Sequence, residues 1–590
     1  MILKKTLLST AIFAATLGLT ACGGSDSNDN NNNGNDSDTT APANTAPSDI
    51  TLSAAVVNDD VIAGEVGTLS ATDDTDSGLT FTLADDEDRF EIVNDTTLKL
   101  KSGIALNFEQ EAQVTVAITV TDAGGLSFTK ELDVSVTDIE AVDGENIYEF
   151  ASKLGSDGSS VSYTGQIARH ALSAEIKHYV GQLTTEYVTN NSLTGDDVKA
   201  QLMALWGDYE AVKDNTMSFV PADSVQKSFA DISSSGKELS GKVAGEDAAK
   251  MYKDWLVDGT FLGWTDFGTQ AKTPEGLIYY YFDLLATNID KHNSGEVLTD
   301  PAGNPITNLY ITAQGLDLNQ LIQKHTLGAV MFSQGTDDYL EQGLETDNIT
   351  SQKDGTSYTA LEHQFDEGFG YFGAARNYLE YSDDEIAAKD GRDEFKAGYN
   401  DYSSDGQIDL ASEYNWGNST NAAKRDRGAE VRTDFTAAAM NAFISGRKLI
   451  NEAVGTALTD EQMTELKGYR DDAVANWEYA IAATVVHYIN DTIADLETIS
   501  TGEYSAEDFA TLAKHYGEMK GFALNFQFSP FSPFNAQGNE DKFAQLHTLF
   551  ADAPVLTDAD AIAQYKTDLE EARELMQQVY GFNAENVSNW

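Results

Sequence analysis

The spacing of the hydrophobic residues changes once, near residue 140, and divides the chain into two regions of different fold class. From about residue 48 to 139, apolar and polar residues alternate in short runs, as in 114–120. This period of two predicts half-buried strands. From 145 to 590 the apolar residues recur every three or four positions, which predicts amphipathic helices. The sequence therefore predicts a multidomain chain, with a small all-β sandwich at 48–140 followed by a large all-α domain at 145–590.

The helical region is too long for the core of one bundle. Thr194, Asp317, Thr459, Ser505 and Thr557 stand where N-caps are expected. We predict two helical bundles packed side by side. The predicted helical stretches are 165–188, 196–209, 276–293, 318–332, 361–380, 428–453, 460–496, 506–527 and 559–580.

The first 21 residues have the pattern of a secretory signal that ends in a lipobox. Lys4 and Lys5 precede an apolar run that closes with Leu-Thr-Ala before Cys22, the only cysteine of the chain. An ordinary cleaved signal is the alternative. With a lipobox, acylated Cys22 becomes the first mature residue and holds the protein at the outer membrane of a bacterial envelope, on its periplasmic or its cell-surface face. Residues 22–47, rich in Asn, Asp, Ser and Thr, predict a flexible tether.

The chain is strongly acidic, with 96 Asp and Glu against 37 Lys and Arg and a formal net charge of −59. Nucleic acid is therefore disfavoured as a partner, because phosphate groups are bound by basic surfaces. After the signal, no apolar run is long enough to span a bilayer, so the lipid is the expected membrane contact. The acidic excess either keeps the protein soluble or helps it to bind cations.

Residues 48–140 resemble a cadherin-like repeat in several motifs. An acidic turn lies at 72–78, a Leu-Asn-Phe-Glu segment at 106–109, Thr-Asp-Ala-Gly-Gly at 121–125 and Val-Thr-Asp-Ile at 136–139. The resemblance implies a β-sandwich and Ca²⁺ bound by turn carboxylates. The alternative is that these carboxylates are solvated turn residues. The ligands that it implies are Asp74, Asp76, Glu109, Asp122 and Asp138.

A second calcium pattern lies in the helical region at 401–413. Oxygen-bearing residues stand at positions 1, 3, 5 and 9 of an EF-hand-like loop, and glycine stands at position 6. Position 12 is Ser412, and a glutamate follows it. The alternative is an Asp- and Gly-rich loop in which Ile408 packs inward. The predicted ligands are Asp401, Ser403, Asp405, Gln407, Asp409 and Glu413.

Two His-acid pairs at helical spacing are the candidate transition-metal ligands. On one helix face, His363 is followed by Asp366 and Glu367, and His515 is followed by Glu518. Imidazole and carboxylate at this spacing can bind one metal ion. The alternative is that each histidine is a packed polar residue beside charge-paired neighbours.

The helical region also resembles the imelysin group of bacterial envelope proteins. The group's Gly-x-His-x-x-Glu motif corresponds to Leu361-Glu362-His363-Gln364-Phe365-Asp366, with the glycine absent and aspartate in place of glutamate. The resemblance implies a pair of four-helix bundles and a link to iron uptake. Some members of the group are assigned peptidase activity. His363 and Asp366 are the residues at the matching positions.

These observations favour an envelope-anchored lipoprotein whose helical domain binds iron, another transition metal or a metal-bearing ligand. One alternative is a calcium-stabilised adhesion protein that binds a cell-surface protein or a polysaccharide. Another is an imelysin-like metallopeptidase with Zn²⁺ near His363. No His-Glu-x-x-His, Gly-x-Ser-x-Gly or Gly-rich phosphate loop supports an enzyme of those classes.

Overall fold

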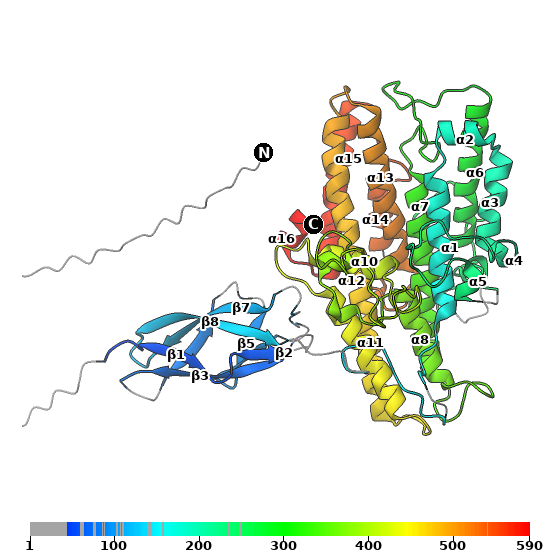
Figure 1. Cartoon of the computed structure of the whole chain (residues 1–590). Helices are drawn as coiled ribbons and strands as arrows, with labels where there is room; N and C mark the ends of the chain where they lie inside the picture. Colours follow the sequence, from blue (N-terminus) through cyan, green and yellow to red (C-terminus); the bar gives the residue numbers. More distant parts are fainter. Residues whose placement is uncertain are drawn as a thin grey trace, which may run out of the picture. The chain divides into compact units, whose positions relative to one another are not determined.

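The computed structural model describes residues 44–590 except 59–63, 75–77, 85–86, 88, 102–103, 105, 107, 109–110, 138–143, 156–157, 234–235, 247–250 and 540. Within these residues, a region of strands is followed by a region of helices, and Figure 1 shows both. The predicted signal, Cys22 and most of the predicted tether lie outside the described residues.

The strands form two four-stranded sheets. One sheet has the order β1-β3-β6-β5 and the other β2-β8-β7-β4. All pairs are antiparallel except β2 with β8. Lettered along the chain, this is the strand order of immunoglobulin-like sandwiches, an architecture that cadherins share. The strands are β1 Asp49–Leu52, β2 Val56–Asn58, β3 Glu65–Thr72, β4 Thr80–Leu83, β5 Phe90–Val93, β6 Thr97–Leu100, β7 Gln113–Thr121 and β8 Ser127–Thr137.

Alternation along the strands builds the core of this sandwich. In β7, Val114, Val116, Ile118 and Val120 are fully buried, and the residues between them face outward. These side chains pack with those of the opposite sheet in one hydrophobic cluster. The predicted cadherin-like sandwich is therefore confirmed as a fold. The sequence patterns did not identify β2, because three residues are too few to establish a period.

The helices of the second region fall into two sets that share one continuous hydrophobic core. α1, α3, α6, α7 and α8 pack against one another, as do α10 to α13 and α15, and the contacts of α7 with α13 and of α8 with α11 join the sets. The helices are α1 Thr164–Gly181, α2 Thr185–Asn191, α3 Gly195–Gly207, α4 Tyr209–Val212, α5 Phe229–Ile232, α6 Pro274–Asn293, α7 Leu318–Thr326, α8 Ala360–Phe372, α9 Asp383–Ile386, α10 Gly417–Asp426, α11 Phe435–Glu452, α12 Asp460–Ile499, α13 Ala506–Ala523, α14 Lys542–Phe550, α15 Ala559–Tyr580 and α16 Ala584–Asn589.

Local hydrogen bonds fix where these helices begin. Thr194, Asp317, Thr459 and Ser505 each accept a backbone N–H as N-caps, so four of the five predicted caps are confirmed. At α15 the cap is Asp558, one residue after the predicted Thr557. α10 and α14 were not predicted, because both are short and their polar faces obscure the apolar period.

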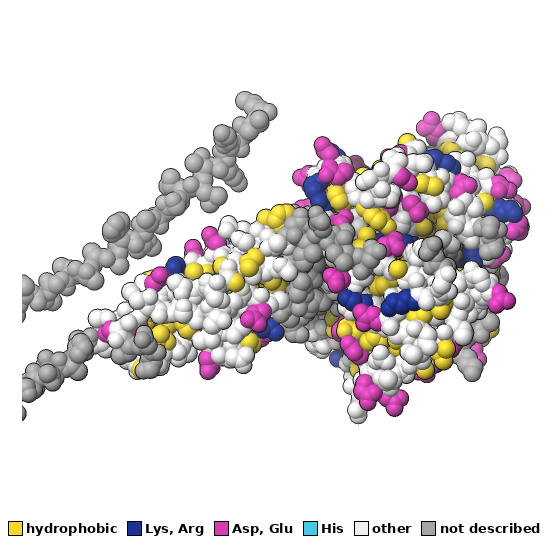
Figure 2. All heavy atoms as spheres, turned by 60° about the horizontal axis from the view of Figure 1, so that its bottom comes forward, with side chains coloured by type: hydrophobic (Ala, Val, Ile, Leu, Met, Phe, Trp, Pro, Cys, Tyr) yellow, Lys and Arg dark blue, Asp and Glu magenta, His cyan; other side chains and the backbone are white. Residues whose placement is uncertain are grey.

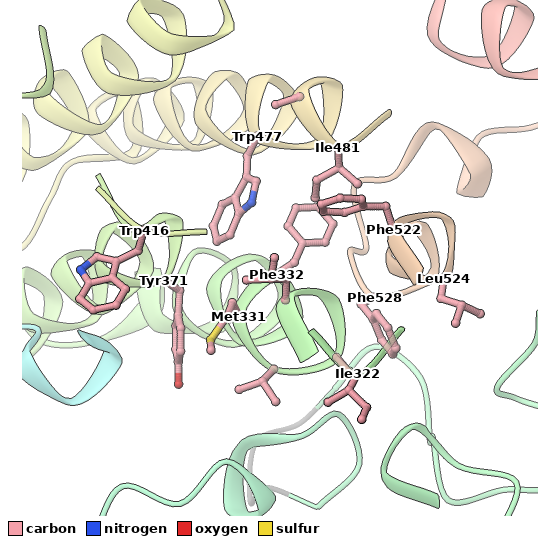
Figure 3. Close-up of a cluster of buried hydrophobic side chains, with 14 of the residues drawn as sticks. Ile322, Met331, Phe332, Tyr371, Trp416, Trp477, Ile481, Phe522, Leu524 and Phe528 are labelled. Atoms are coloured by element: carbon pink, nitrogen blue, oxygen red, sulfur yellow. The ribbon is translucent and has the colours of Figure 1, made fainter. Parts of the chain in front are cut away.

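Two π-helical segments continue α7 through the centre of the domain, at Leu327–Phe332 and Gln334–Tyr339. Every residue of the first segment is buried, and Figure 3 shows Met331 and Phe332 near Trp477 of α12. A π-helix widens the turn and changes the backbone hydrogen bonding. The amide of Asn525, oriented so that its nitrogen donates, reaches the carbonyl oxygens of Lys324 and Gly521 at 3.2 and 3.1 Å.

No helix among the described residues is both long enough and apolar enough to cross a membrane.

Substitutions of two glycines test how tightly the π-helical segment is packed. A Cβ added at Gly328 would lie 1.9 Å from a terminal atom of the Asn525 side-chain amide, whereas a Cβ at Gly468 of α12 would have no neighbour within 4 Å. We expect Gly328→Ala to destabilise the protein by about 1–3 kcal/mol through overpacking. We expect Gly468→Ala to stabilise it by about 0.5–1 kcal/mol through helix propensity. Urea unfolding measures both, and equal effects would contradict the packing argument.

Candidate functional site

The predicted His363–Asp366 pair lies on α8, but its two members have different partners. The Nδ1 atom of His363 is 2.9 Å from the carbonyl oxygen of Ser162, and its Nε2 is 3.8 Å from Glu367 Oε1. Asp366 is fully buried and forms an ion pair with Arg447 of α11, 2.8 Å from Nε to Oδ1. Asp366 also accepts hydrogen bonds from the Tyr148 hydroxyl and from the Ser162 amide. This motif therefore builds a buried ion-pair network.

Arg447 is the centre of that network. Its Nη1 is 2.8 Å from Glu362 Oε1, its Nη2 donates to Ser160 Oγ at 2.8 Å, and its guanidinium covers the ring of Phe150. Burial raises the pKa of Asp366, and the positive charge of Arg447 partly offsets the effect. The sequence does contain a signal for this arginine, because it stands at an apolar position of α11, three residues after Ile444 and three before Ile450.

The second predicted pair, His515 and Glu518, lies on α13 and is also divided between partners. His515 Nδ1 is 2.8 Å from Asp495 Oδ2 of α12. Burial lowers the pKa of His515, but this hydrogen bond and the negative charges of Asp495 and Asp491 together outweigh burial, so the pKa is raised. Glu518 instead faces Lys324 of α7, with 3.5 Å between Nζ and Oε1.

Of the predicted transition-metal ligands, His363 and Glu367 lie 3.8 Å apart, whereas Asp366, His515 and Glu518 each have another partner. His363 contacts Ser162, Tyr358 and Glu367, whereas His515 contacts α12. In the part of the chain that the structure describes, no three His, Cys, Asp or Glu side chains are placed to hold a metal ion. Arg447 pairs with Asp366 and Lys324 pairs with Glu518, so these two predicted ligands have cationic side chains as partners.

The loop at 401–413 is closed by hydrogen bonds to its own carboxylates. Asp401 accepts the amides of Asp405 and Gly406 at 3.0 and 2.7 Å. Glu413 accepts those of Ser403 and Asp409 at 3.0 and 2.8 Å. The backbone of the loop pairs with the segment at Ser224 and Val225. These bonds account for the shape of the loop, and calcium binding by it stays a prediction.

Gln407 and Asp409 complete the account of that loop. The backbone N–H of Gln407 donates to Asp405 Oδ1 at 2.9 Å, and Asp409 Oδ1 accepts from the side-chain amide of Gln226 at 2.7 Å. Position 12, Ser412, donates its hydroxyl to Asp409 at 2.8 Å.

The calcium ligands predicted in the sandwich are only partly described. Asp122 is buried, and its Oδ1 accepts the amides of Gly124 and Leu126 in the turn between β7 and β8. Asp74 is exposed. Asp76, Glu109 and Asp138 lie outside the described residues.

A group of cationic side chains between the helices was not found by sequence reasoning. Lys177 of α1, Lys324 of α7, and Lys424 and Arg425 of α10 lie around Glu518, and we call them the cationic centre. Lys324 and Arg425 are each 91 % or more buried, and Lys177 and Lys424 are half-buried. No short sequence pattern links the four residues, because they come from three helices far apart in the chain.

All four cations have lowered pKa values: repulsion by Lys324 is the largest cause at Lys177, and burial is the largest cause at the other three. Lys324 and burial together lower the pKa of Lys177 to about 7. Burial, Lys324 and Arg425 lower the pKa of Lys424 to about 8. Burial lowers the pKa of Arg425 to about 10. Shifts of this size mean that the positive charge is poorly compensated.

Within the described part of the chain, two of the four cations lack a close anionic partner, although Asp317 acts on Lys177 and Asp491 acts on Arg425 at longer range. Among the described residues, Lys177 and Lys424 make no ion pair within 4 Å, and Nε of Arg425 has no hydrogen-bond partner. This is unexpected in a chain with more than two acidic residues for every basic one. Figure 2 shows acidic side chains spread over the face it displays. Poorly paired, desolvated cations of this kind are suited to bind an anion.

The comparison with known families agrees with the extent of the helical region. Residues 146–532 match the family described as Domain of unknown function (DUF4856), which covers more than half of the chain. The chain belongs to this family. The DUF4856 region contains α1 to α13, and so it includes both the Arg447 network and the cationic centre. No curated protein matches the chain.

Solved structures match only a small part of the chain. Two structures of human protocadherin-24 EC1-2 are 24 % and 23 % identical, cover 18 % and 19 % of this chain and 51 % and 50 % of theirs, and have TM-scores of 0.15. A structure of PcdhgB3 EC1-4 is 25 % identical and covers 16 % of this chain and 24 % of its own, with a TM-score of 0.14. The chain thus spans about half or less of the length of these proteins.

Neighbouring residues of α11 allow a matched test of the Arg447 network in the DUF4856 region. We expect Arg447→Met to lower the free energy of unfolding by about 3–5 kcal/mol, because it leaves Glu362 and Asp366 buried without a cation. Lys448 pairs with Glu145 at the surface, and its side chain is 42 % exposed. Lys448→Met should therefore change the free energy of unfolding by about 1 kcal/mol or less. Urea unfolding with EDTA present measures both. Similar losses in the two variants would show that the network is not the cause.

Proposed function

We propose that this protein is a binding protein of the bacterial cell envelope whose helical domain captures an anionic ligand at the cationic centre. The observation that carries the proposal is the group of four desolvated cations, Lys177, Lys324, Lys424 and Arg425, around Glu518, of which Lys177 and Lys424 make no ion pair within 4 Å among the described residues. A bound carboxylate or phosphate would supply the missing negative charge and accept the unused donors.

The proposal includes the place where the protein works. The lipobox at Cys22 would anchor the chain to the outer membrane, and the acidic tether and sandwich would lie between the anchor and the binding domain. Capture of an iron chelate fits this setting, because complexes of iron with polycarboxylates are anionic. In this interpretation the protein binds the chelator's negative groups rather than the metal itself, which explains how a metal-bearing ligand is bound without His363 and Asp366 as ligands.

The first test measures binding of defined anions to the full chain by calorimetry at low salt. The probes are sulfate, inorganic phosphate, citrate and ferric citrate. Each charge-assisted hydrogen bond contributes about 1.5–3 kcal/mol, so Lys177→Gln and Lys424→Gln should each weaken binding by about tenfold or more. Lys467→Gln is the matched control, because Lys467 is an exposed α12 residue paired with Glu345.

Two outcomes of that experiment have a defined meaning. If ferric citrate binds more tightly than citrate, the iron-chelate interpretation is supported. If none of the four anions binds, or if the control variant loses as much affinity as the two centre variants, the proposed function is wrong.

The second test uses pH. In the free protein the pKa values of Lys177 and Lys424 are about 7 and about 8, and an anion binds their protonated forms more tightly. Affinity for sulfate, whose charge is constant in this range, should therefore fall as the pH rises from 6 to 9. Deprotonation of Asp317, whose pKa burial raises to about 7, acts in the same direction. Binding near pH 7.5 should take up protons, which calorimetry in buffers of different ionisation enthalpy measures. Affinity that is constant or that rises with pH would contradict the assignment.

A further inference from the structure

A pocket lies on the long helix α12, and none of the residues of the cationic centre lines it. Its volume is about 290 Å³, at the lower end of the range of small-molecule sites. Residues at i, i+1, i+4 and i+5 of α12 form one wall, and the segment after α13 forms the other. The lining residues are Val474, Ala475, Glu478, Tyr479, Phe531 and Pro533, with the exposed Asp471 at the edge.

The walls of the pocket are held firmly by contacts outside it. The guanidinium of Arg470 lies 4.2 Å from the centre of the Phe531 ring and donates to the carbonyl oxygen of Leu340 at 3.0 Å. On the other side of the segment, Asn535 and Asn539 donate to the carbonyl oxygens of Ser529 and Pro533. The pocket is therefore largely formed before any ligand enters.

Glu478 is the one acidic group buried in this pocket, and only half of its hydrogen-bonding capacity is used. The carboxyl is 98 % buried. Its Oε1 accepts the hydroxyls of Ser532 and Tyr580 at 2.6 and 2.8 Å. No residue that the structure describes donates to its other oxygen, Oε2. Burial raises the pKa of Glu478 to about 7, against the two hydrogen bonds that lower it.

We propose that this pocket binds a small organic amine, with the ammonium group on Glu478 Oε2 and a compact apolar body against Val474, Ala475 and Phe531. An ammonium supplies both the donor and the positive charge that the buried carboxylate lacks. The neighbouring cation, Arg470, does not compensate Glu478, because its Nε pairs with Asp471 at 2.6 Å.

The side chains that line the pocket favour some hydrogen-bond-donating ligands over others. Apolar side chains and the Tyr479 ring favour a hydrocarbon or aromatic body over a sugar or a peptide backbone, whose polar groups would go unpaired. The net charge of −59 also favours cations over anions at long range. This pocket is proposed to bind a cation and the cationic centre an anion, so failure of one proposal does not affect the other.

The test titrates 2-phenylethylamine into the full chain at 0.15 M salt, where weak attraction to the acidic surface is screened. The neutral isostere 2-phenylethanol is the comparison ligand. We expect saturable binding of the amine, at least tenfold weaker binding of the alcohol, and at least tenfold weaker binding of the amine to Glu478→Gln. Asp472→Asn, which removes an acidic charge from the same helix outside the pocket lining, should leave the affinity unchanged.

A second variant keeps the test decisive if Glu478→Gln unfolds. Ala475→Leu adds bulk inside the pocket and leaves the carboxyl unchanged. It should abolish amine binding without changing the melting temperature of the protein. The proposal is overturned if the amine does not saturate, if the alcohol binds equally well, or if Ala475→Leu binds the amine as the unchanged protein does.

Discussion

The arrangement of the helical domain depends on the burial of the Arg447 guanidinium between two carboxylates. Glu362 and Asp366 lie one turn apart on α8, and Arg447 reaches them from α11. Moving such charges out of water costs several kcal/mol each unless every donor finds an acceptor. Tyr148 and Ser160 complete the set from the segment that precedes α1. α8, α11 and this segment can therefore pack in one register only.

The Arg447 network follows the rule that buried charges are paired, whereas the cationic centre does not. At Arg447, one cation meets two carboxylates and a hydroxyl. At the centre, four cations lie around Glu518, only Lys324 among them forms an ion pair with it, and the Arg425 Nε atom has no hydrogen-bond partner among the described residues. The chain has acidic residues in excess, so its composition allowed this charge to be balanced. The proposed anionic ligand would balance these cations, which are kept near one another and out of water.

The fold could largely be predicted from local patterns, whereas the sites could not. Strand alternation and the caps at Thr194, Thr459 and Ser505 act over a few residues, so the sequence displays them directly. The His363–Asp366 motif was also visible, but its role depends on Arg447, 81 positions beyond Asp366. A helical His-x-x-Asp pattern has the same appearance whether a metal or an arginine faces it. No sequence motif marks the cationic centre, because its members are single basic residues on helices far apart in the chain.

The length of α12 relates the two proposed sites. Tyr488, beside Glu518, and Glu478, in the apolar pocket, are ten residues apart on this helix. With a rise of 1.5 Å per residue, they lie about 15 Å apart along its axis. α11 and α13 both pack against α12, so the helix is held along much of its length. A compact ligand cannot reach both positions, so the proposed amine pocket on α12 and the proposed anion site around Glu518 of α13 would each bind a ligand of its own.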